Sequence, residues 1–263
     1  MENEIDKIVL TVNKAIEISN GLLIEHWKDG IANSIPFDSK EDLSPVTKTD
    51  KLIETEIRKI IAENHADHSV IGEELGVENN EDSGYKWFID PIDGTRQFVR
   101  GMRFFGTQIA VMYENQIIIG ASNAPALGER VVAVKNQGTK LNGKPIRVSN
   151  IDTLNKSFFS HGDVTHFAQT NTLQQLLRLC ENSWGNRGLG DFWSYHLVAQ
   201  GQIDAMLEAK TKIWDIAAIS LIVSEAGGAV SDFDGNPIDE RSTSIVASNA
   251  RIHDLILSEL HRV

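Results

Sequence analysis

The 263-residue sequence has only one cysteine, Cys180, so no disulfide bond can form within the chain. Because Cys180 follows the apolar helical stretch LLRL, we expect a buried, unreactive thiol there. The chain also lacks any run approaching the ~20 apolar residues that cross a bilayer, so we expect no membrane partner. Its first ten residues carry acids where a signal peptide would carry Lys or Arg, which predicts a cytoplasmic protein.

Basic residues are scarce: 25 Lys and Arg stand against 37 Asp and Glu, a formal net charge of −12. Such a surface repels nucleic acid, and we expect no nucleic-acid partner. Most of the excess acid serves solubility. The 41% hydrophobic content can fill a sizeable core. We therefore expect a single domain over residues 1–263, with two packed halves at roughly 1–150 and 151–263.

Hydrophobic periodicity predicts interleaved helices and strands. The predicted helices lie near residues 5–16, 52–61, 164–181, 191–200, 214–226 and 250–262. The predicted strands cover residues 69–72, 85–89, 106–113, 116–121, 130–134, 204–208 and 244–248, and Glu114-Asn115 predicts a tight hairpin turn. Polar residues 29–48 predict a loop, and His65 and His68 are expected at the surface. The resulting class is α/β (α+β), with helices covering the sheets.

The most informative segment is the run DPIDGT, which ends an apolar strand. Asp90 and Asp93 bracket Pro91, whose fixed φ makes the turn rigid. Gly94 lets the backbone approach a ligand closely, and Thr95 is placed to begin a helix. The segment predicts a corner that holds metal and phosphate. The alternative is an ordinary surface turn, for which the same residues are suited.

Two further acidic segments adjoin core-forming runs. Glu73 and Glu74 follow the predicted strand 69–72, and Asp215 follows Trp214 at the start of an almost wholly apolar helix. An acid at that place can also serve as a helix cap or an N-terminal charge. We nevertheless expect the three segments to meet in space.

Converging carboxylates need a partner, because acids within ~4–6 Å repel one another and raise each other's pKa. Divalent cations relieve this repulsion, and an all-oxygen ligand set favours Mg²⁺, Mn²⁺ or Ca²⁺ over zinc. Asp90 and Asp93 are three residues apart, so the Asp-x-Asp spacing of aspartyl-phosphate enzymes is absent. This spacing favours direct attack by water on a phosphate ester.

Four segments together resemble the signatures of the inositol monophosphatase family, in the family's order and spacing. They are Pro45–Asp50, Ile71–Glu74, Trp87–Thr95 and Trp214–Ala218. The resemblance covers nearly the whole chain. It implies a layered α-β-α-β-α sandwich of the inositol monophosphatase / sugar phosphatase type, a homodimer, and two to three Mg²⁺ ions per site, with Mn²⁺ as a possible substitute.

The resemblance also implies a role for each matching residue. Glu73, Asp90 and the backbone carbonyl of Ile92 would hold a first metal ion; Asp90, Asp93 and Asp215 would hold a second. Glu73 would help to bind a third, and it would also be one of the catalytic residues. Thr95, with Thr47 or Asp50, would orient the attacking water. The substrate-binding residues that it implies are Asp93, Gly94, Thr95, Arg187, Asp191, Glu208 and Asp215.

Within the family, three segments resemble the histidinol-phosphate phosphatase branch: residues 98–101, 123–128 and 188–195. The implied substrate, a small phosphorylated metabolite, would be histidinol phosphate, an intermediate of histidine biosynthesis whose ammonium and imidazole suit Asp191 and Glu208. Arg187 would reach either substrate phosphate or a neighbouring subunit. The alternatives are a phosphatase for inositol 1-phosphate or another sugar or nucleotide phosphate, and a non-catalytic regulatory protein on the same fold.

Overall fold

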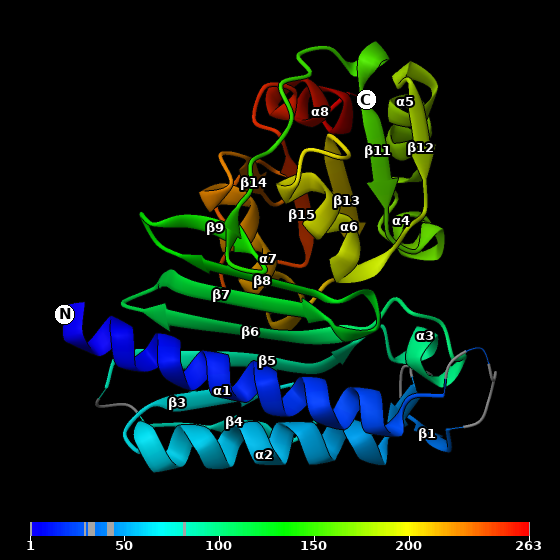
Figure 1. Cartoon of the computed structure of the whole chain (residues 1–263). Helices are drawn as coiled ribbons and strands as arrows, with labels where there is room; N and C mark the ends of the chain where they lie inside the picture. Colours follow the sequence, from blue (N-terminus) through cyan, green and yellow to red (C-terminus); the bar gives the residue numbers. More distant parts are fainter. Residues whose placement is uncertain (1, 29, 31–34, 41–44, 81–82, 263) are drawn as a thin grey trace.

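A computed structural model of the chain describes residues 2–28, 30, 35–40, 45–80 and 83–262. Helices and sheets alternate in five layers (Figure 1). The first helical layer holds α1 (Glu2–His26) and α2 (Lys48–Asn64), the middle one α6 (Asp191–Ala199) and α7 (Ile213–Glu225), and the last one α4 (Val164–Gln169), α5 (Leu173–Asn182) and α8 (His253–Leu260). The predicted α-β-α-β-α order is confirmed.

An eight-stranded sheet separates the first helical layer from the second, with strand order β10-β9-β8-β7-β6-β5-β3-β4. Its strands are β3 (Ser69–Gly72), β4 (Gly76–Glu78), β5 (Tyr85–Asp93), β6 (Gly106–Tyr113), β7 (Gln116–Ala124), β8 (Glu129–Val134), β9 (Gly138–Leu141) and β10 (Lys144–Pro145). Only β3 and β5 pair in parallel among these neighbours. The hairpin predicted at Glu114-Asn115 is confirmed: both residues have positive φ, as in a two-residue type I′ turn, and they join β6 to β7.

A five-stranded sheet lies between the second and third helical layers, with strand order β12-β11-β13-β15-β14. Its strands are β11 (Phe158–His161), β12 (Gly185–Arg187), β13 (Ala205–Ala209), β14 (Ala229–Ser231) and β15 (Ser244–Ser248). Short 3₁₀ turns at Pro125–Leu127 and Leu154–Lys156, and the short helix α3 (Thr95–Val99), complete the connections.

Helix α7 is apolar on every side because it lies between the two sheets. Ile216, Ile219 and Ile222 are at most 1% exposed, and α7 packs on β5, β6 and β7. A helix buried all round carries no polar stripe. Its approach to β7 is so close that a Cβ at Gly120 would lie 2.4 Å from the carbonyl oxygen of Ala218. The buried helix thus fixes the place of its own N-terminus, where Asp215 lies.

Three predictions about local structure were wrong. Part of the predicted loop 29–48 forms a two-stranded ladder of β1 (Phe37–Ser39) and β2 (Pro45–Thr47), too short to show an alternating pattern; residues 29, 31–34 and 41–44 lie outside the described residues. The predicted helix 164–181 is two helices, because the chain turns at Asn171 with φ 59°. His65 and His68 are buried, at 4% and 7% exposure, because they stack beside Trp87 and Tyr85.

Two further findings bear on the expectations from composition. Cys180 is half-buried, which is less than the sequence predicted, and this partial burial raises the pKa of its thiol. Among the described residues, no helix combines the length and the hydropathy needed to span a bilayer.

Candidate active site

Asp90 and Asp93 reach the same pocket because strand β5 is irregular between them. In a regular strand, residues three apart point to opposite faces. Here the β5–β6 pairing runs from Asp90 opposite Gln108 to Asp93 opposite Gly106, so β5 carries one extra residue. This β-bulge brings both carboxylates to one cavity. Asp90 is 3% exposed.

The backbone turns sharply directly after Asp93. Gly94 has φ +85°, and a Cβ there would lie 2.5 Å from the carbonyl oxygen of Phe104. Only glycine combines this conformation with so close a neighbour. Thr95 then begins the five-residue helix α3, and its hydroxyl donates to the carbonyl oxygen of Ile92 at 2.8 Å. The turn thereby holds the Thr95 side chain at the edge of the cavity.

The cavity has a volume of about 170 Å³ and draws its lining from five separate segments of the chain. These are the turn after β3, the end of β5 with the start of α3, the start of α6, strand β13, and the start of α7. The lining residues are Glu73, Asp90, Ile92, Asp93, Gly94, Thr95, Asp191, Glu208 and Asp215. All nine are residues that the sequence predicted for the site.

Thr47 and Asp50 lie behind the cavity, at the start of α2. The backbone N–H and the hydroxyl of Thr47 both donate to Asp50 Oδ2, at 2.7 and 2.6 Å. In return the Thr47 hydroxyl oxygen accepts the backbone N–H of Asp50 at 3.4 Å, which completes a capping box. The other oxygen, Oδ1, lies 3.4 Å from the Thr95 hydroxyl, so the pair adjoins the cavity through Thr95. Burial raises the pKa of Asp50 to about 6, although hydrogen bonds from Thr47 oppose the rise.

Arg187 is the predicted site residue that does not join the others. It is exposed on β12, and its Nη1 donates to the neighbouring carbonyl oxygen of Asn186 at 2.6 Å. Sequence reasoning in turn missed Lys40, whose Nζ lies 2.6 Å from Glu73 Oε1 and also contacts Glu74. Burial works against the charge of Lys40, but Glu73 and Glu74 outweigh it and raise its pKa. A lone lysine in a polar stretch gives no signal of this pairing.

The crowded carboxylates have strongly raised pKa values. Burial raises the pKa of Asp215 to about 7, with Glu73 adding to it, and the pKa of Glu208 to about 8, with Asp191 adding to it. Burial and acidic neighbours also raise the pKa of Asp90 and of Asp93 well above the usual range. The protein alone therefore does not balance the negative charge of its own pocket.

The donor set fits divalent cations that prefer oxygen. Asp90 Oδ1 is buried without a hydrogen-bond partner among the described residues, which costs free energy unless a ligand contacts it. The carboxylates of Asp93 and Asp215 line the same cavity. Hard cations such as Mg²⁺ and Mn²⁺ take such ligands. The pocket therefore fits the ions that the sequence predicted.

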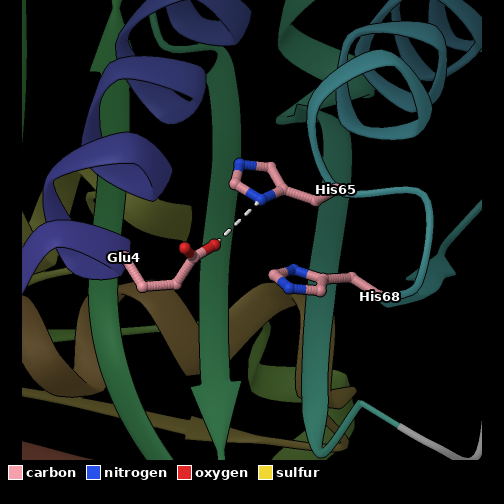
Figure 2. Close-up of side chains that lie close together, drawn as sticks. All are labelled: Glu4, His65 and His68. Atoms are coloured by element: carbon pink, nitrogen blue, oxygen red, sulfur yellow. Dashed lines mark ion pairs between the residues drawn. The ribbon is translucent and has the colours of Figure 1, made fainter. Parts of the chain in front are cut away.

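A second group of titratable side chains, none of which lines this pocket, lies between α1, the end of α2 and the start of β3 (Figure 2). Glu4, His65 and His68 bring ligand atoms within 4.8 Å of one another. However, Trp87 Nε1 lies 3.0 Å from His68 Nδ1, and an indole can only donate. The remaining nitrogen of neutral His68 must then carry the proton. His68 has no free lone pair for a metal, and we read the group as a structural contact between the two helices and the sheet.

A layered α/β fold that gathers acids from distant segments beside a tight Gly-Thr turn is the arrangement expected of a hydrolase that works with oxygen-bound metal ions. Residues 8–263 match the inositol monophosphatase family. The chain is 35% identical over 240 residues to a histidinol-phosphatase of Streptomyces coelicolor, covering 88% of this chain and 89% of that one. The chain belongs to the inositol monophosphatase family, whose members hydrolyse phosphate monoesters.

Two other relatives show the breadth of the family. Nus factor SuhB of Haemophilus influenzae is 35% identical over 220 residues, covering 82% of both chains. The solved structure of an IMPase from Thermotoga maritima superposes with a TM-score of 0.86 at 29% identity, covering 97% of this chain and 96% of that one.

Proposed function

We propose that this protein is a Mg²⁺-dependent phosphatase that hydrolyses histidinol phosphate, a step of histidine biosynthesis. The observation that carries the metal dependence is the buried oxygen of Asp90, which has no hydrogen-bond partner in the described part of the chain and lies amid carboxylates with raised pKa values. Two to three Mg²⁺ ions would relieve this repulsion, and Mn²⁺ would substitute. Glu73, Asp90, Asp93, Asp215 and the carbonyl oxygen of Ile92 would hold them.

Bound divalent ions supply Lewis-acid charge and lower the pKa of water. The protein's own part is to place that water and accept its proton. The Thr95 hydroxyl donates its single proton toward Ile92 or Asp50, so its lone pairs remain to accept from water in the cavity. Asp50, with a pKa of about 6, is suited to receive the proton behind Thr95.

The acidic side of the cavity favours a cationic leaving group. Glu208 accepts a hydrogen bond from the Tyr195 hydroxyl at 3.0 Å, and Asp191 lines the same wall. No Lys or Arg is among the described residues that line this cavity. The ammonium and imidazole of histidinol phosphate therefore suit it better than a second phosphate group would. Relatives named histidinol-phosphatase, at 34–35% identity, support this choice.

The test is kcat/KM on histidinol phosphate and on myo-inositol 1-phosphate, side by side and with an EDTA control. We expect a clear preference for histidinol phosphate and loss of activity in EDTA. If the protein hydrolyses myo-inositol 1-phosphate but not histidinol phosphate, the proposed substrate is wrong and the phosphatase assignment still holds. Activity that survives exhaustive chelation would remove the metal dependence.

A second candidate function is that of a regulatory protein on the same fold, since a Nus factor is among the relatives. That function would tolerate loss of a metal ligand or of Thr95, whereas all of them line one pocket here. Inositol 1-phosphate and other sugar or nucleotide phosphates remain the alternative substrates for the comparison above. We further propose that residues 1–263 form a single domain and that the protein is cytoplasmic. We also propose that it is a homodimer, which light scattering would test.

A further inference from the structure

Helix α2 carries a second acid, Glu54, that faces the turn between β3 and β4. Its side chain is completely buried. Glu54 Oε2 accepts the backbone N–H of Glu74 at 2.8 Å, and Oε1 accepts that of Leu75 at 3.2 Å. The residues of this turn, 73–75, include Glu73 of the acidic cavity. One buried carboxylate thus binds two of the three N–H groups of the turn.

The third N–H of the turn is also fixed. Glu73 donates its N–H to the carbonyl oxygen of Ile89 on β5 at 3.1 Å. Sheet pairing cannot satisfy the other two, because they lie beyond the last paired residues, Gly72 and Gly76. Glu54 therefore fixes the backbone at the two residues that directly follow Glu73.

Two neighbours show that the place of the Glu54 carboxylate is closely defined. A Cβ at Gly72 would lie 1.9 Å from Glu54 Oε1, so the carboxylate fits against the chain only because residue 72 is glycine. Arg58 donates to Glu54 Oε1 at 2.9 Å and to the carbonyl oxygen of Gly76. Arg58 therefore balances the charge of Glu54 and ties it to the far end of the turn.

We propose that Glu54 is a positioning residue that sets the affinity of the acidic pocket for its cation by fixing Glu73. The inference rests on the proposed role of Glu73 as a metal ligand. Glu54 does not line the cavity. Asp50 lies one turn before Glu54 on α2. The same helix therefore places both Asp50, which contacts Thr95, and Glu54, which binds the turn after Glu73.

The perturbation is Glu54→Gln, which keeps the shape of the side chain. It replaces one acceptor oxygen by an NH₂ group, which is itself a donor and cannot accept the N–H group that the oxygen bound. Substitutions of groups that orient metal ligands typically weaken metal binding about 10–100-fold. We expect the Mg²⁺ concentration at half-saturation to rise at least about 10-fold. Two readouts measure this concentration: the Mg²⁺ dependence of Tm and the Mg²⁺ dependence of phosphatase activity. At saturating Mg²⁺, kcat should stay within about threefold of the wild-type value.

The chain offers a matched control in Glu225. Its two carboxylate oxygens accept the N–H groups of Asn136 at 2.8 Å and Gly138 at 2.9 Å, in the turn between β8 and β9. These are the same two backbone contacts, made by a half-buried glutamate on a turn whose residues do not line the acidic cavity. Glu225→Gln should lower Tm without changing the Mg²⁺ half-saturation. If Glu54→Gln behaves in the same way, Glu54 stabilises the fold only and the proposal is wrong.

A second variant guards against a Glu54→Gln protein that fails to fold. Gly72→Ala introduces a Cβ 1.9 Å from the tip of a flexible side chain, which displaces the carboxylate with the helix intact. We expect the same weakening of Mg²⁺ binding, and an unchanged half-saturation would overturn the proposal. Because the Tm readout needs no substrate, this outcome is distinguishable from failure of the proposed phosphatase function, which would leave every variant inactive.

Discussion

Asp215→Asn should make the metal-free protein more stable, although it removes a residue from the site. The pKa of Asp215 is raised from 3.8 to about 7 by burial and by Glu73. The folded state therefore binds more protons than the unfolded state between these values, and stability falls as pH rises through this range. At pH 8 the ionised carboxylate destabilises the fold fully. Asparagine has no charge to lose, and its oxygen can still accept the N–H of Lys212 that Asp215 accepts at 2.8 Å.

The magnitude follows from the shift in pKa. A rise of roughly three units corresponds to about 4 kcal/mol of unfavourable free energy at pH 8. For a chain of this size, 1 kcal/mol moves Tm by about 2–4 °C, so the variant should melt roughly 10 °C higher in EDTA. The difference should shrink as the pH is lowered from 7 and vanish near pH 4.

Mg²⁺ should act in the opposite direction. At about 100 times its Kd, a ligand that binds only the folded state adds about 2.7 kcal/mol, and the wild type should gain this where Asp215→Asn does not. The assay is thermal unfolding of both proteins in EDTA and in Mg²⁺, from pH 4 to 8. A variant that melts below the wild type at pH 8 in EDTA would refute the reasoning, because it would show that the ionised Asp215 does not destabilise the fold.

Further predictions concern turnover and the turn after β5. Asp93→Asn should abolish turnover and leave the circular dichroism spectrum unchanged; near-normal rates at saturating Mg²⁺ would show that Asp93 is no ligand. Gly94→Ala should lower both Tm and activity, since its Cβ would lie 2.5 Å from the Phe104 carbonyl oxygen in a left-handed conformation; an unaffected variant would disprove the close approach. Thr95→Val should lower kcat about 10²–10⁴-fold while Thr95→Ser retains most of it; equal loss in both would argue against a role for the hydroxyl.

Much of the site could be predicted from the sequence because its chemistry lies at the ends of strongly patterned elements. The apolar run before Asp90 and the apolar run after Asp215 each predict an element whose end reaches the edge of a buried layer. The acids at these ends had to meet a cation or repel one another. The layered fold and the gathering of Glu73, Asp90, Asp93 and Asp215 are both present in the structure.

Other features have no local signal. The burial of His65 and His68 arises from stacking against residues of β5, some 20 positions away in sequence. Arg187 was expected to reach substrate phosphate or a neighbouring subunit, but its strand lies at the outer edge of the five-stranded sheet, away from the cavity lining. Lys40 meets Glu73 across more than thirty residues. Which charged side chains meet depends on the packing of layers, and sequence spacing does not encode it.

By itself, the sequence determined the longer helices and strands, their order, and a set of acids that repel one another, because hydrophobic periodicity and the repulsion of like charges are properties of the residue types. Only the tertiary structure decided that a bulge in β5 turns Asp90 and Asp93 into one cavity and that Glu54 holds the turn bearing Glu73. Both are matters of register and close packing, which depend on contacts between segments distant in the chain.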